Sequence, residues 1–127
     1  MEDLIKNRYS DEELEEFREI INRKLNKVLE QIKFLRGQIE DISNSADGRI
    51  KGLDDGVGTA ESERVMQMLA RANKHKKHLE NAIVRIDNKV YGVCRVTGKL
   101  ISKERLKAVP HATLSIEAKQ MKKKNRR

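Results

Sequence analysis

The sequence predicts an all-α-dominated protein in which a long antiparallel helical hairpin precedes a small module of short strands and a C-terminal helix. Two apolar stripes of similar length, with spacings of three and four residues, lie on either side of a glycine-rich stretch and predict the hairpin. From Tyr91 onward this periodicity gives way to short segments between turn formers, which predicts the module. With 3% aromatic and 38% charged residues, the chain suits amphipathic helices better than a compact globule.

The first helix is predicted to begin at Ser10-Asp11-Glu12-Glu13, which has the pattern of a capping box. In this motif the Ser10 hydroxyl accepts from an unpaired backbone amide, while Glu13 reaches back to the amide of Ser10. Gly37 lies off the apolar stripe and costs about 1 kcal/mol relative to Ala, which a helix of this length tolerates. The apolar stripe consists of Leu14, Phe17, Ile21, Leu25, Val28, Ile32, Leu35, Ile39 and Ile42.

The first helix must end in the stretch 44–59, NSADGRIKGLDDGVGT, which contains four of the seven glycines. Thr59 is the predicted N-cap of a second helix. Its apolar stripe consists of Val65, Met68, Ala72, His75, Leu79, Ile83, Ile86 and Val90. Folding the two helices against each other buries both stripes, so we expect residues 1–90 to form a coiled-coil hairpin with its tip near 44–59. Periodicity alone also allows one half of a longer, dimeric coiled coil.

Residues 91–127 are expected to form the small module. The segments YGVCRV and LISKERLKAV flank the turn TGK, Pro110 ends the second segment, and a last helix is expected from about Thr113. The end of the chain, KQMKKKNRR, is a basic run that is typical of a solvated tail, with weak phosphate contact as the alternative.

The net charge of +8 is the sum of an acidic half and a basic half. Residues 1–63 contain ten Lys or Arg against sixteen Asp or Glu, net −6, and residues 64–127 contain eighteen against four, net +14. This division indicates either a partner with strong fields of its own, such as a nucleic-acid enzyme, or two solvated helices. A single cysteine fits a reducing compartment, and the sequence has no signal peptide or membrane-spanning run. We therefore expect a cytoplasmic protein.

Two segments, CRVT at 94–97 and SIEA at 115–118, have the spacing of paired C-x-x-C zinc knuckles. The four ligand positions are occupied by Cys94, Thr97, Ser115 and Ala118. Thr, Ser and Ala do not replace the thiolates that a structural zinc requires, and His111 would add only a second ligand. We therefore expect no metal and no cofactor, with Cys94 as a small buried hydrophobe. The expected metal-free core consists of Val93, Val96, Leu100, Ile101, Leu106, Val109, Leu114 and Ile116.

The segment YGVCRVTGKLISKERLKAVPHATLSIEAK resembles the zinc-knuckle region of the DksA/TraR family of bacterial transcription factors. The matches to the family pattern are Tyr91, Gly92, Cys94, Gly98, Ile101, Arg105, Leu106, Ala108, Pro110, Leu114, Ile116 and Lys119. The predicted hairpin matches the family architecture as well. The resemblance therefore implies a degenerate zinc finger, with the four knuckle residues as former zinc-ligand positions.

The resemblance also implies a function for the hairpin, whose tip in this family enters the secondary channel of RNA polymerase with acidic residues. The family tip pattern is Asp-x-x-Asp-x-Ala, and counting back from the cysteine places it on Lys51, Asp54 and Gly56. A shifted alignment, on Asp55, Gly58 and Ala60, requires a four-residue insertion. We take Asp54 first, Asp55 second and Lys51, which replaces an acid, as the candidate partner-binding residues.

The expected function is therefore a monomeric, non-enzymatic transcription regulator that binds RNA polymerase. No nucleophile with a base and no phosphate-binding loop appears, and His75 and His78 are expected to be interface and surface residues. Direct nucleic-acid binding is expected to be secondary. Two alternatives remain: a basic nucleic-acid or ribosome-associated accessory protein that uses the +14 half, and a plain coiled-coil scaffold. The sequence leaves open whether guanosine tetraphosphate co-operates.

Overall fold

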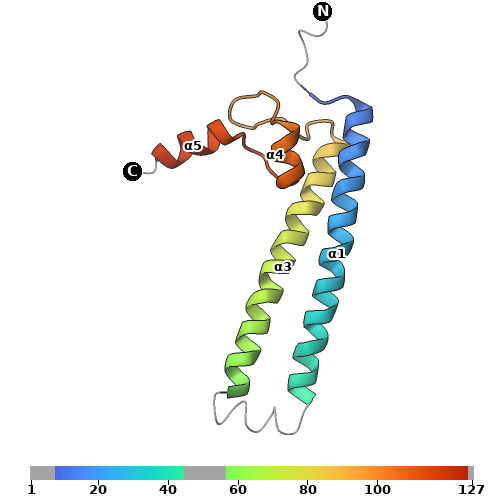
Figure 1. Cartoon of the computed structure of the whole chain (residues 1–127), viewed down its shortest axis with the longest axis vertical. Helices are drawn as coiled ribbons and strands as arrows, with labels where there is room; N and C mark the ends of the chain where they lie inside the picture. Colours follow the sequence, from blue (N-terminus) through green and yellow to red (C-terminus); the bar gives the residue numbers. More distant parts are fainter. Residues whose placement is uncertain (1–7, 45–56, 126–127) are drawn as a thin grey trace, which may run out of the picture. The chain divides into compact units, whose positions relative to one another are not determined.

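The computed structural model describes residues 8–44 and 57–125 and contains four helices in these ranges (Figure 1). The helices are α1 (Asp11–Asn44), α3 (Val57–Asp87), α4 (Lys103–Ala108) and α5 (Ile116–Asn125). The long helices α1 and α3 form the predicted antiparallel hairpin. No helix within the described ranges is long and apolar enough to cross a membrane.

The chain divides into two compact units. One combines the chain up to Lys24 with the chain from His78 onward, and the other is Leu25–Lys77. In the second unit, the middle and end of α1 pack against the first part of α3. Its buried apolar side chains are Val28, Ile32, Leu35, Val65 and Ala72. All five lie on the predicted stripes, which confirms the period of three and four.

The first unit begins with the capping box. The amide of Ser10 donates to Glu13 Oε1 over 2.9 Å, and the amide of Glu13 donates to Ser10 Oγ over 3.1 Å. This confirms the predicted start of α1. In contrast, α3 begins at Val57, so Thr59 lies inside the helix instead of capping it.

Helix α3 ends in a Schellman motif. The amide of Val90 donates to Arg85 O, and that of Lys89 donates to Ile86 O, both over 3.0 Å. Lys89 has φ 64°, the left-handed conformation that this motif requires. Val90 therefore lies beyond the helix and is 49% exposed, although the apolar stripe placed it on the buried face.

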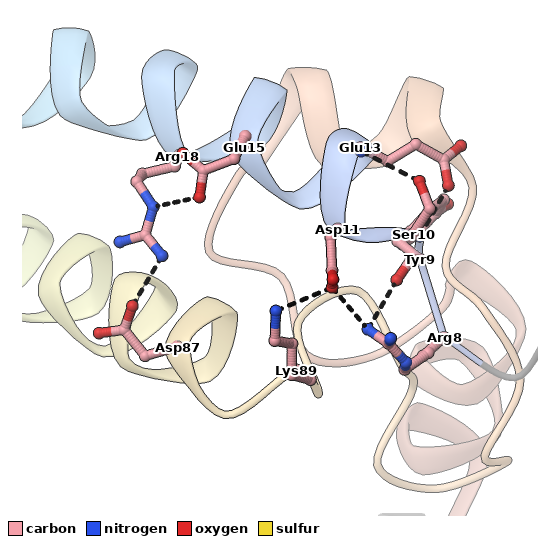
Figure 2. Close-up of polar contacts among 9 residues, drawn as sticks. All are labelled: Arg8, Tyr9, Ser10, Asp11, Glu13, Glu15, Arg18, Asp87 and Lys89. Carbon is pink, nitrogen blue, oxygen red and sulfur yellow. Dashed lines mark hydrogen bonds and ion pairs between the residues drawn. The ribbon is translucent and has the colours of Figure 1, made fainter.

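Ion pairs join the beginning of α1 to the end of α3 (Figure 2). Asp11 accepts from Arg8 over 3.3 Å and from Lys89 over 2.8 Å. Arg18 bridges Glu15, at 3.1 Å, and Asp87, at 2.7 Å. Because these ion pairs face water, each contributes little to the stability of the fold. They favour this alignment of the two helix ends.

Three aromatic rings form the centre of the first unit. The ring centroid of Phe17 lies 5.5 Å from that of Tyr9 and 5.2 Å from that of Tyr91. Both tyrosine hydroxyls are satisfied, since Tyr9 donates to Ile101 O and Tyr91 donates to Pro110 O over 2.8 Å. Burial raises the pKa of both hydroxyls, so they remain donors.

The C-terminal module has an isolated antiparallel bridge, Val93 to Leu100, where short strands were predicted. The amide of Gly98 closes the intervening turn onto Cys94 O over 2.8 Å, so the turn leaves little length for pairing. The short helix α4 is capped by Ser102, whose side chain accepts from the amide of Arg105. Helix α5 begins at Ile116, later than the predicted Thr113.

The core of this module differs from the predicted set of eight aliphatic residues. Only Ile101 and Leu106 of that set are fully buried, while Val96 and Ile116 are each 55% exposed. The other buried residues of the module are Tyr91, Gly92, Cys94, Pro110, Ala112 and Ala118. Small side chains and an aromatic ring, more than branched aliphatics, therefore fill this core.

We expect Gly92→Ala to destabilise the protein strongly. Gly92 has φ +80°, and a Cβ atom there would lie 2.6 Å from Cε2 of Tyr9. Gly98 is the matched control, because it has φ +74° but open space around its Cβ position. Urea unfolding should show a loss of about 1–2 kcal/mol for Gly98→Ala from backbone strain and about 1–3 kcal/mol more for Gly92→Ala from the clash. Equal losses would contradict the close packing of the Tyr9 ring.

We expect the ion pair between Glu13 and Lys103 to make stability depend on pH in the acid range. Glu13 Oε2 lies 2.6 Å from Lys103 Nζ. The hydrogen bond from Lys103, followed by that from the Ser10 amide, lowers the pKa of Glu13 to about 2. Because the folded-state pKa is depressed, this stabilisation is complete above the ordinary Glu pKa of about 4.3 and is lost as the pH falls toward 2.

The measurement is the difference in free energy of unfolding between wild type and Glu13→Gln, followed from pH 6 downward. This difference should shrink through the acid range. The same comparison in a Lys103→Met background should vary less with pH, because the first cause of the shift is then absent. An unchanged pH dependence in that background would show that Lys103 is not responsible.

Candidate functional site

The sulfur of Cys94 is the point at which the two knuckle segments meet. Cys94 is 1% exposed, and its Sγ accepts from the amide of Thr97 over 3.5 Å and from the amide of Ser115 over 3.4 Å. Ser115 also caps α5, since its Oγ accepts from the amide of Ala118 over 3.1 Å. The structure therefore brings the predicted ligand positions together through hydrogen bonds.

The surroundings of Cys94 favour the thiolate. Burial by itself raises the pKa of the thiol, but hydrogen bonds from the Thr97 side chain and from the amides of Ser115, Thr97 and Val96 together outweigh it and lower the pKa to about 6. The expectation that Cys94 would be a buried residue is confirmed. Its description as a simple hydrophobe omitted the hydrogen bonds that it accepts.

A cavity of about 270 Å³ lies beside the knuckle in the same unit. Arg85, from α3, donates to His111 O over 3.3 Å, and Arg105, from α4, donates through Nε to Leu114 O over 2.9 Å. The rings of His78 and His111 stack with centroids 5.1 Å apart. The residues that line this cavity are His78, Asn81, Arg85, Arg105, Val109, His111, Ala112, Thr113, Leu114 and Lys119.

This cavity is chemically suited to an anionic group. Arg85, Arg105 and Lys119 place three positive charges around it, and the carbonyl contacts fix both guanidinium groups in orientation. Burial lowers the pKa of Arg85. The cavity could not be predicted from the sequence, because its residues come from three separate stretches of the chain. The only signals were Arg105, Leu114 and Lys119, which belong to the family pattern.

The candidate tip residues Asp54, Asp55 and Lys51 lie outside the described residues. Their assignment therefore stays a prediction from the sequence.

The fold and the knuckle together define a helical-hairpin protein with a C-terminal module of the zinc-knuckle type. The family model for the prokaryotic dksA/traR C4-type zinc finger matches residues 89–122. This match, the DksA relatives and the DksA2 structure described below together support membership of the DksA/TraR family.

The curated relatives match about half of the chain. A segment of 64 residues is 33% identical to the RNA polymerase-binding transcription factor DksA of Caulobacter vibrioides and covers 49% of this chain and 45% of that protein. A segment of the same length is 34% identical to the uncharacterized protein YteA of Bacillus subtilis and covers 50% of this chain and 27% of that protein. The matches thus span less than half the length of these curated relatives.

A solved structure matches more of the chain. The transcription factor DksA2 from Pseudomonas aeruginosa is similar with a TM-score of 0.79 and 26% sequence identity, over 89% of this chain and 84% of that chain.

The expectation of no cofactor is corrected by the family match, because the matching family model is a C4-type zinc finger and zinc binding is a property of the family. The residues of this chain do not fit a site of four thiolates, since Thr97, Ser115 and Ala118 occupy three of its positions. In the ranges 8–44 and 57–125, no group of three or more His, Cys, Asp or Glu residues could hold a metal ion.

We expect Cys94→Ala to destabilise the module. The substitution leaves the amides of Thr97 and Ser115 without the sulfur acceptor, at about 1–3 kcal/mol for each donor that remains unpaired and buried. Cys94→Ser is the control, because its hydroxyl is an acceptor of similar size. The free energy of unfolding, measured with a chelator present, should fall in the order wild type, Ser, Ala. A Cys94→Ala variant as stable as Cys94→Ser would contradict a role for these hydrogen bonds.

Proposed function

We propose that this protein is a non-enzymatic transcription regulator that binds RNA polymerase and modulates initiation through the segment between α1 and α3. The observation that carries the proposal is the likeness to DksA2, which extends over 89% of the chain and so includes both the hairpin and the knuckle module. The curated relatives named as RNA polymerase-binding factors support the same partner.

The proposed action at the polymerase depends on carboxylates. Asp54 and Asp55 lie in the chain between the end of α1 at Asn44 and the start of α3 at Val57. Carboxylates delivered into the secondary channel could pair with basic side chains or backbone amides, or with a metal-bound water near the catalytic centre. Lys51 at the first position of the family pattern reverses the charge there, so we propose a weaker or altered effect compared with relatives that have both acids.

The test combines a pull-down on purified core polymerase with transcription in vitro. We expect wild type and an Asp54→Asn, Asp55→Asn double variant to bind core polymerase equally, while only wild type changes initiation. Asp41→Asn is the matched control, because Asp41 is an exposed carboxylate near the end of α1. It should behave as wild type in both assays.

Two outcomes would overturn parts of this proposal. If wild type does not bind core polymerase, the proposed partner is wrong. If the double variant regulates as wild type does, the acidic residues are not the active groups.

A nucleic-acid-binding accessory protein is the second candidate, and the net charge of +14 over residues 64–127 favours it. This function predicts binding to free DNA or RNA that weakens steeply as salt rises, with or without polymerase. Binding that requires polymerase would exclude it.

A further inference from the structure

Gly37 is the starting observation, because nothing inside the described structure explains a glycine at this position. It lies within α1, where glycine is unfavourable compared with nearly every other residue. Its φ is not positive, unlike those of Gly92 and Gly98. A Cβ atom at Gly37 would meet nothing within 4 Å, so no neighbouring side chain requires its absence.

The missing side chain opens a groove on the second unit. A hollow of about 470 Å³ lies along α1 and extends to Lys76 of α3, and Gly37 forms part of its wall. Its other lining residues are Leu29, Ile32, Lys33, Arg36 and Glu40. Leu29 is 41% exposed and Ile32 is 5% exposed, so the groove has an apolar floor that reaches the surface.

The rim of the groove is positively charged. Lys33, Arg36 and Lys76 face a single acid, Glu40, which leaves two uncompensated positive charges. Within the described residues, no ion pair or hydrogen bond involves the side chains of Lys33, Arg36 or Lys76. These groups are therefore available to carboxylates from outside.

The combination of an apolar floor and a basic rim selects one kind of occupant. A phosphodiester backbone would satisfy the cations but would leave Leu29 without an apolar contact. A second copy that used the same face would bring like charges together. A partner helix with an apolar ridge and flanking carboxylates satisfies both features, and the absence of a side chain at Gly37 allows it to approach α1 closely.

We propose that this groove docks an acidic amphipathic helix of the partner protein, with an apolar side chain over Leu29 and Gly37 and carboxylates against Lys33, Arg36 and Lys76. The inference rests on the proposed function in one respect: the polymerase is taken as the protein that supplies the helix. It adds a binding surface on the side of the hairpin to the proposed action of the segment between the helices.

The decisive variant is Gly37→Leu, which adds a side chain to the wall of the groove at a position where a Cβ atom meets nothing within 4 Å, and which replaces a poor helix former. The matched control is Gln38→Leu, which adds the same side chain to the next position of α1, is exposed and does not line the groove. Affinity for purified core polymerase is measured for both, and urea unfolding confirms that both are folded. We expect binding to weaken about tenfold or more for Gly37→Leu and to be unchanged for Gln38→Leu.

Two charge-reversal variants test the basic rim of the groove. Lys33→Glu should weaken binding, while Lys27→Glu, an exposed lysine of α1 outside the groove, should change it little. Sedimentation and binding to free DNA are measured on the same variants.

Each remaining result would overturn the inference. If wild type binds polymerase and Gly37→Leu binds equally well, the groove is not a docking site while the proposed function stands. If wild type fails to bind polymerase, both are wrong. Wild-type dimers that Gly37→Leu dissociates would identify a second copy as the occupant. Loss of DNA binding in Lys33→Glu but not in Gly37→Leu would identify nucleic acid.

Discussion

The approach of the Tyr9 ring to the backbone at Gly92 is the contact on which the first unit depends. Tyr9 immediately precedes the N-cap of α1, and Gly92 follows the end of α3. Since Gly92 has no Cβ, the ring can lie against the chain while its hydroxyl donates to Ile101 O. One side chain thereby links the start of α1 to the exit from α3 and to the segment that leads into α4. Phe17 extends this link by packing between Tyr9 and Tyr91.

The knuckle shows how residues that cannot bind zinc still take part in a polar site. Thr97 and Ser115 contribute their backbone amides to the sulfur of Cys94, and Ser115 also uses its hydroxyl to cap α5. Ala118, in the last former ligand position, is small enough to be fully buried. The arrangement satisfies donors that would otherwise be unpaired, since a buried amide without an acceptor is costly.

Two hollows, one in each unit, differ in chemistry and therefore suit different ligands. The cavity of the first unit has Arg85 and Arg105 held by carbonyl oxygens, so it presents oriented donors to an anionic group. The groove of the second unit has an apolar floor at Leu29 with cations only at its rim. Such a surface suits a protein side chain flanked by carboxylates, because apolar contact and charge pairing are available together.

The sequence by itself determined the elements that depend on near neighbours. The capping box at Ser10 and Glu13 was predictable because all its partners lie within one turn, and the hairpin was predictable because its apolar stripes have helical spacing. The resemblance to the DksA/TraR family also followed from local spacing, from Tyr91 to Lys119. These features can be predicted without knowing which residues pack against them.

Tertiary structure alone decided the rest. Val90 belongs to the apolar stripe by spacing, but α3 ends before it in a motif set by Lys89. Tyr91, Cys94 and Ala118 belong to the core of the module, whereas Val96 and Ile116 are exposed, because burial depends on partners many residues away. The groove beside Gly37 likewise could not be predicted from the sequence, because its other lining residues come from two helices that only the fold brings together. Periodicity predicts which face of a helix is apolar, whereas long-range packing decides which residues of that face are buried.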